Sequence, residues 1–175
     1  MPTKKKTQPE EPSPVDLNLR SREMTGTLTP DMKRFDIFLI DTGWNAPVSK
    51  IVRSQLRHLF EYQMQDSLYE LTVEQSAAIL KQDPALIGCD PTIIVYDLYG
   101  CTRKDAGNYC GFRLNLGLIR NAEHALARLQ EFVRFLAIHR TAERLDREVR
   151  RELHREGIEG IVKILRETSV EMLME

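Results

Sequence analysis

The side chains best suited to chemistry in this 175-residue chain are its three cysteines. Cys89 is followed directly by Asp90 and stands two residues before Pro91. A thiolate at this position could attack a peroxide or a disulfide, but the neighbouring carboxylate opposes loss of the thiol proton. We therefore interpret Cys89 as a small, partly buried residue, and we keep an atypical thiol-dependent redox protein as the alternative.

Cys101 and Cys110 flank a short segment that carries two basic residues, Arg103 and Lys104. If this segment turns back as a hairpin, the two sulfur atoms could come close enough to bridge, and the basic side chains would favour a thiolate. A low cysteine count without a secretory signal is typical of a reducing compartment, where thiols stay free. We therefore expect a cytoplasmic protein whose cysteines are unpaired.

Other kinds of chemistry find less support in the residues. The four histidines form no recognisable catalytic or metal-binding pattern, and the chain has no His-Glu-x-x-His sequence and no glycine-rich nucleotide loop. A net charge of -1 provides no field that would attract nucleic acid, and no apolar run approaches the ~20 residues of a membrane span. We therefore expect no metal, no cofactor, no nucleic-acid partner and no membrane association.

Strands and helices that alternate along the chain must position these side chains. Branched and aromatic residues predict strands at 35–40, 68–72, 92–96 and 112–116. Apolar stripes at helical spacing predict helices at 46–64, 74–82 and 121–139. Pro47 would lie in the first turn of the first helix with Asn45 as its N-cap, and Asp83-Pro84 would end the second. The order βαβαββα predicts an α/β domain with a parallel strand pair and a final antiparallel hairpin.

The turn between the first strand and the first helix reads Trp44-Asn45-Ala46-Pro47-Val48. It resembles the Trp-Cys-Gly-Pro-Cys redox turn of the thioredoxins with both cysteines replaced, and residues 33–137 resemble the thioredoxin fold along their length. Residues 87–92 are similar to the loop that carries the family's cis-proline, which implies a cis bond before Pro91. The short, glycine-containing turn Asp41-Thr42-Gly43 and the missing Cys-x-x-Cys pair also resemble KaiB-type modules, which bind proteins.

The resemblance implies the thioredoxin fold without its usual reaction. Asn45 and Val48 can neither attack nor resolve a disulfide, and Asp41 lies too close to the turn to match the family's buried carboxylate. The family's peptide-binding groove would remain, and it would be formed by Trp44, Asn45, Pro47, Asp90 and Pro91. We therefore predict a redox-inactive protein-interaction module that serves an unidentified protein partner as an adaptor, an assembly chaperone or a regulatory subunit. That Trp44 simply packs over the end of the sheet is the alternative for this residue.

Two segments flank the predicted domain of residues 31–139. Residues 1–30 are rich in charge and proline and predict a disordered N-terminal tail. Residues 140–175 predict a helical extension, because charges alternate over 141–156 and an amphipathic pattern follows from residue 158. On that last helix, Ile161, Leu165 and Leu173 would anchor a protein partner or a second copy of the chain. A purely structural homo-oligomer is thus a further alternative.

Overall fold

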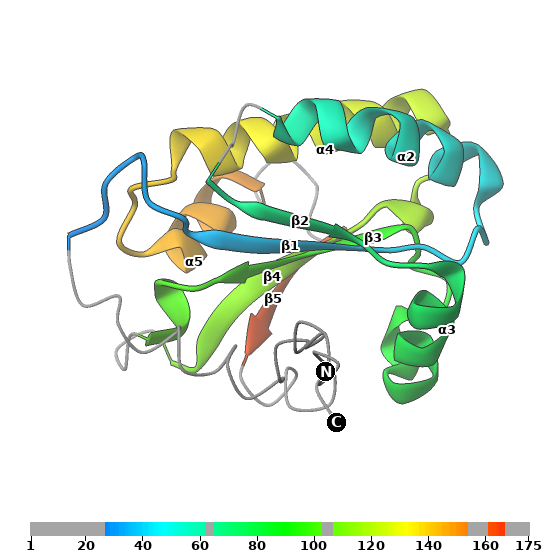
Figure 1. The fold of residues 1–175 in the computed structure, drawn as a ribbon, viewed down its shortest axis with the longest axis horizontal. Coiled ribbons are helices and arrows are strands. Elements are labelled where there is room, and N and C mark those ends of the chain that lie inside the picture. The colour runs from blue at the N-terminus through cyan, green and yellow to red at the C-terminus, as the bar shows by residue number, and fades with distance from the viewer. Residues whose placement is uncertain (1–26, 62–64, 103–106, 154–160, 167–175) are drawn as a thin grey trace, which may run out of the picture.

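The computed structural model describes residues 27–61, 65–102, 107–153 and 161–166. They form an α/β fold in which a five-stranded mixed sheet has helices on both faces (Figure 1). In chain order the elements are β1 (Phe35–Ile40), α2 (Ala46–Phe60), β2 (Ser67–Glu70), α3 (Val73–Gln82), β3 (Thr92–Asp97), β4 (Tyr109–Asn115), α4 (Ala122–Ile138), α5 (Leu145–Glu148) and β5 (Val162–Arg166). None of the helices in this described part is both long and apolar enough to cross a bilayer.

The strands lie in the order β2-β1-β3-β4-β5. β1 and β2 are parallel and are connected by α2, whereas β3 is antiparallel to both β1 and β4, and β5 is antiparallel to β4. A parallel pair cannot be joined by a tight turn, so the chain crosses over through a helix. The predicted α/β class, the parallel pair and the final antiparallel hairpin are therefore confirmed.

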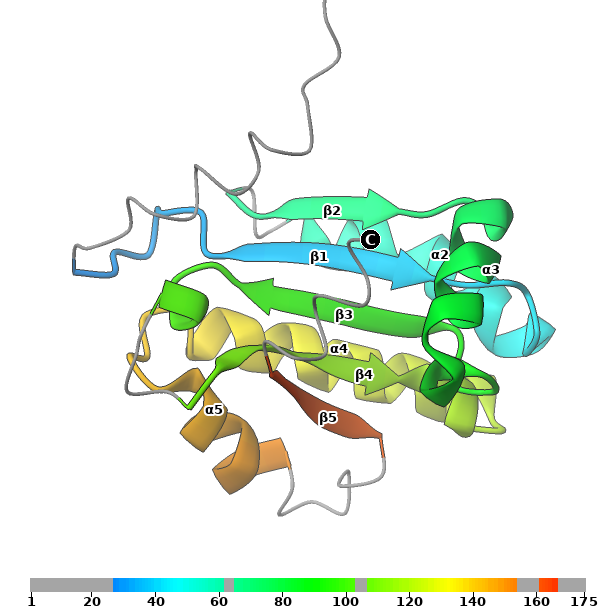
Figure 2. The ribbon, with the colours of Figure 1, turned by 90° about the horizontal axis from the view of Figure 1, so that it is seen from below.

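Each face of the sheet packs against its own helices. α2 and α4 lie side by side on one face, and α3 covers the opposite face at the end where β1 finishes and β3 begins (Figures 1 and 2). The main core lies under α2 and α4, where Phe112 meets Phe132 edge to face at 5.4 Å. The second core, under α3, contains Ile40, Leu86 and Ile94. The sheet is thus apolar on both faces, as expected of a strand layer between two helical layers.

The helix boundaries follow the capping residues of the sequence. Thr72 and Gln75 form a reciprocal capping box at the start of α3, which ends before Asp83-Pro84 as predicted. Asn45 occupies the predicted N-cap position of α2 with Pro47 in the first turn, but its side chain makes no capping hydrogen bond. α2 ends at Phe60, and residues 62–64 of the longer predicted helix lie outside the described residues.

The predicted amphipathic helix after residue 158 is wrong for residues 162–166, which form β5. β5 pairs with β4 in an antiparallel register that places Val162 opposite Leu114. A short apolar run fits either period, and the open edge of β4 supplies the backbone partners that a helix would not use. Leu165 is buried and Ile161 packs against the core, so neither is an exposed anchor, and Leu173 lies outside the described residues.

The charged segment that follows α4 is helical in part, but it is not a solvated extension. α5 is a single turn, and a π-helical turn over residues 149–153 continues it. Leu145 and Val149 are buried in the main core, so this segment packs against the domain through these two side chains. At the other boundary, residues 1–26 of the predicted tail lie outside the described residues, whereas the carbonyl of Pro30 accepts a hydrogen bond from Arg140 Nε at 2.9 Å.

A buried ion-pair network lies at the end of the sheet where β1 begins. Arg34 donates from Nε and Nη2 to the two carboxylate oxygens of Asp97, at 3.0 and 2.8 Å. Its Nη1 donates to the carbonyl oxygens of Arg140 and Ala142 at 2.6 and 2.8 Å. Arg140 donates in turn to Asp66, which also accepts the backbone N–H of Arg34. The network therefore ties the start of β1 to the end of β3, to β2 and to the turn after α4.

Two tyrosines should make the fold sensitive to alkaline pH. Burial and then the charge of Asp97, to which the hydroxyl donates at 3.3 Å, raise the pKa of Tyr109 well above its ordinary value. Burial and then the neighbouring Cys110 and Cys101 raise the pKa of Tyr96. An unfolded chain ionises tyrosine at about pH 10, so this contribution to stability is complete below that pH and is lost as the pH rises above it.

We therefore expect fewer tyrosines to ionise in the folded protein than in urea at the same pH slightly above 10. The measurement is an alkaline titration followed by phenolate absorbance, with circular dichroism to report the fold. The Y96F variant is the control, because it should lose one of the protected groups. Ionisation of all five tyrosines while the circular dichroism remains native would contradict the prediction.

Candidate functional site

Three loops meet where β1 and β4 end and β3 begins (Figure 2). The N–H of Gly117, in the loop after β4, is shared between the carbonyl oxygens of Cys89 and Pro91 at 2.9 and 3.1 Å. The side-chain amide of Asn45 donates to the carbonyl oxygens of Gly117 and Ile119 at 3.3 and 3.1 Å. Asn45 and Pro91, which the resemblance places in one groove, are therefore joined through Gly117.

The loop before β3 is held by its own carboxylate. The bond between Asp90 and Pro91 is cis, as the resemblance implies. Thr42 donates from its backbone N–H and from its hydroxyl to Asp90 Oδ2, at 2.9 and 2.5 Å. Asp90 is only 1% exposed, and Pro91 is buried as well. The prediction that these two residues form the contact surface therefore needs correction, because they lie beneath it and position the loops.

Asp41 holds the turn that presents Trp44. It is buried and accepts hydrogen bonds from Ser49 Oγ at 2.7 Å, from Arg53 Nε at 2.6 Å and from the N–H of Gly43 at 2.9 Å. Gly43 has a φ of +80°, which a residue with a side chain rarely adopts. Both oxygens of this carboxylate therefore accept hydrogen bonds that shape the turn.

Each of the three loops carries one exposed apolar side chain. Trp44 is 72% exposed, Ile87 65% and Leu118 49%, and we call these three residues the loop-end surface. Trp44 therefore does not pack over the end of the sheet, and Pro47 beside it is exposed as well. Ile87 and Leu118 are not among the contact residues predicted from the sequence, although each is an apolar residue beside a loop glycine. An apolar residue beside a loop glycine was the sequence feature that could have indicated their exposure.

The cysteines do not assemble a thiol site among the described residues. Cys89 is buried at the loop end, and its Sγ lies 3.5 Å from the carbonyl oxygen of Ala85, to which it donates. Cys101 Sγ donates to the carbonyl oxygen of Cys110 at 3.0 Å, near the opposite end of β4 from Gly117. In the described part of the chain, the three cysteines form no disulfide with one another.

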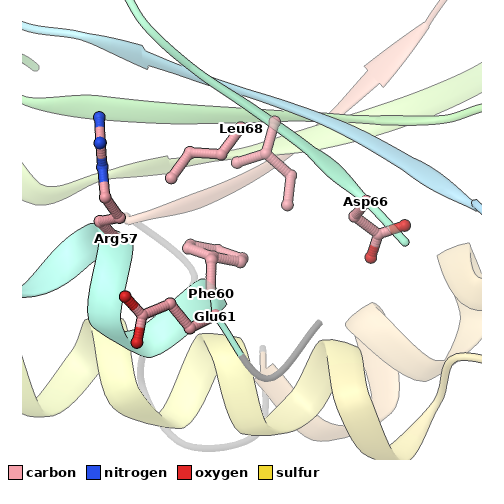
Figure 3. A pocket seen from close by; sticks show the side chains of 6 residues that line it. Arg57, Phe60, Glu61, Asp66 and Leu68 are labelled. Carbon is pink, nitrogen blue, oxygen red and sulfur yellow. The ribbon is translucent and has the colours of Figure 1, made fainter. Parts of the chain in front are cut away.

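A small pocket lies away from this surface, between the end of α2 and β2 (Figure 3). Its volume of about 140 Å³ is below the roughly 300 Å³ at which ligand sites usually begin. Its charged side chains already have partners, since Asp66 binds Arg140 and Arg57 pairs with Glu70. The pocket therefore does not compete with the loop-end surface as a candidate site.

Comparison of the chain with models of protein families, with curated proteins and with solved structures gives no significant match.

Proposed function

We propose that this chain is a redox-inactive, thioredoxin-like protein-interaction module that acts as an adaptor, an assembly chaperone or a regulatory subunit. The strand order β2-β1-β3-β4, with β3 antiparallel to its neighbours, supports this fold assignment. So do the two helices on one face and the single helix α3 on the other (Figure 1). The fifth strand is an addition at the edge.

The absence of redox chemistry rests on the two positions where the thioredoxin turn carries its thiols. Asn45 uses its amide to join two loops, and Val48 is fully buried in the main core. Neither side chain supplies a nucleophile or a resolving group. The turn therefore keeps the backbone form of the thioredoxin turn but has no group that could react.

The loop-end surface is the observation that carries the proposal. Tryptophan is enriched among the residues that dominate binding at protein interfaces, and here each of the two adjoining loops carries a further exposed apolar side chain. The loops are fixed by hydrogen bonds from Asn45, Thr42 and Gly117, so little further ordering is needed when a partner binds. A rigid apolar platform of this kind fits an apolar segment of another protein.

We expect that replacing Trp44 by alanine removes the partner and leaves the fold intact. The measurement compares proteins retained from the native cell by the full chain and by W44A, followed by direct binding of the purified partner. Loss of a central tryptophan anchor should weaken binding by about 2 kcal/mol or more, whereas an exposed position should change stability by about 0.5 kcal/mol or less.

The matched control is I138A. Ile138 is also apolar and 62% exposed, but it lies at the last residue of α4 and so at the other end of that helix from the loop-end surface. The partner should be retained by I138A as well as by the unchanged chain. Equal retention by W44A and I138A would refute the assignment of the surface. Recovery of nothing but further copies of the chain would favour the homo-oligomer instead.

A further inference from the structure

α5 lies beneath the carboxyl end of α4 (Figure 1). There a histidine and two glutamates come together. His139 follows α4, Glu148 is the last residue of α5, and Glu152 lies in the π-helical turn. His139 Nε2 is 2.8 Å from Glu152 Oε2, and Nδ1 is 3.8 Å from Glu148 Oε2. One potential ligand atom from each of the three side chains lies within 4.8 Å of the others.

The fold holds these three residues in place. The ring of His139 packs on Phe135 at 4.7 Å, and its carbonyl oxygen accepts a hydrogen bond from Arg34. Glu148 and Glu152 are four residues apart and so lie on one side of their helical segment. Leu145 and Val149, on the adjacent face of that segment, are buried in the main core. The cluster is therefore built from anchored elements rather than from a free loop.

The charges of the cluster leave room for a cation. Glu148 Oε2 is buried, and its close partners among the described residues are Arg151 Nη2 and, at 3.8 Å, His139 Nδ1. Among the described residues, Arg151 is the cation that contacts both glutamates, and its side chain is 61% exposed and can turn into solvent. With neutral imidazole the four side chains sum to one negative charge.

We propose that His139, Glu148 and Glu152 bind a divalent transition-metal ion of the Zn²⁺ class. Imidazole nitrogen and carboxylate oxygen are the ligands that such ions accept, and ligand bonds of about 2.0–2.2 Å place neighbouring ligand atoms about 3.3 Å apart. A single ion takes only one ring nitrogen of His139, so the carboxylates of Glu148 and Glu152 must both turn toward that nitrogen. Glu152 is 42% exposed and has room to do so. The remaining coordination position is open to water.

The bound ion would join the end of α4 to α5 and to the π-helical turn that continues it. α4 has 17 residues and is about 25 Å long at 1.5 Å per residue, so the site is separate from the loop-end surface at the start of that helix. Arg151 supplies the positive charge when the metal is absent and competes with it. If the cluster is a metal site, removing Arg151 should therefore strengthen metal binding, whereas a plain ion-pair cluster would bind no metal with or without Arg151.

The test titrates the full chain, previously freed of metal with a chelator, with Co²⁺ and with Zn²⁺. We expect visible d–d absorption from Co²⁺ and calorimetric binding of one Zn²⁺ per chain at this site. H139A and E152Q should weaken binding by about tenfold or more. R151A should tighten binding by up to about fivefold, since an exposed ion pair contributes at most about 1 kcal/mol.

Two controls make the result decisive. H124A removes an exposed histidine from the first turn of α4 and should leave the affinity unchanged. E152Q alters a half-exposed side chain, so its fold should survive, as circular dichroism will show. Absence of Co²⁺ absorption, a thiolate-to-metal charge-transfer band, or binding that H139A and E152Q leave unchanged would each overturn the proposal.

Discussion

Replacing Arg34 with methionine is expected to lower the free energy of unfolding by about 3–5 kcal/mol. The substitution leaves Asp97 fully buried without its counter-charge, and it removes the donor that binds the carbonyl oxygens of Arg140 and Ala142. Isolated buried charge is far costlier than the net gain from the intact pair. Urea unfolding followed by circular dichroism measures the loss.

The matched control is R57M. Arg57 also pairs with a carboxylate, Glu70 at 3.2 Å, but its side chain is 76% exposed, so its loss should cost about 1 kcal/mol or less. R34K should fall between the two, because lysine keeps the charge but not the two parallel hydrogen bonds. If R34M fails to fold, R34K still tests the prediction. A loss for R34M and R34K no larger than that for R57M would contradict it.

The importance of Arg34 has no local signal in the sequence. Lys33 and Asp36, which stand beside it, form an ordinary partly exposed ion pair, and nothing in this run marks Arg34 as the fully buried member. Its partner Asp97 lies 63 residues away. Strand β1 itself could be predicted to the residue, because branched and aromatic side chains dominate it. The spacing of apolar residues thus predicts helices and strands. Which polar side chains become buried between them is decided only when the sheet is assembled.

The C-terminal strand illustrates a second limit. Residues 161–166 suit a short helix or a short strand equally well, and only the unpaired edge of β4 decides between them. The same applies to the proposed metal cluster. Glu148 and Glu152 are joined to His139 by the turn after α4 and by a π-helical turn, and no standard ligand spacing describes that path. A search for motifs along the chain therefore passes over His139.

The candidate surface could be predicted in part. Trp44 and Pro47 are exposed at the turn where the sequence placed them, because a strand-to-helix turn with a proline in the first helical turn is a local feature. Asp90 and Pro91 were predicted in the right loop, but they are buried beneath its surface instead of exposed on it. Which residues of a loop face solvent depends on the loops beside it. Here that neighbour is Gly117, which packs directly on the proline loop.

Replacing Gly117 with alanine is expected to lower the free energy of unfolding by about 2–4 kcal/mol. A Cβ atom at this position would stand 2.1 Å from the carbonyl oxygen of Asp90 and 2.6 Å from that of Cys89. Both are backbone atoms, so the clash cannot be relieved by turning a flexible side chain. The two loops must separate, and the hydrogen bonds from the Gly117 N–H to Cys89 and Pro91 are lost with them.

G43A is the control that separates this close approach from backbone conformation. Gly43 lies on the same end of the molecule and has a φ of +80°, but a Cβ atom there would meet nothing within 4 Å. Its replacement by alanine should lower the free energy of unfolding only by the cost of holding alanine in a left-handed conformation, about 1–2 kcal/mol. Urea unfolding compares the two variants, and amide exchange should show faster opening of residues 89–92 in G117A alone. If G117A were no less stable than G43A and exchanged no faster at those residues, the three loops could not be packed as a unit, and the loop-end surface would lose the rigid support on which its proposed role depends.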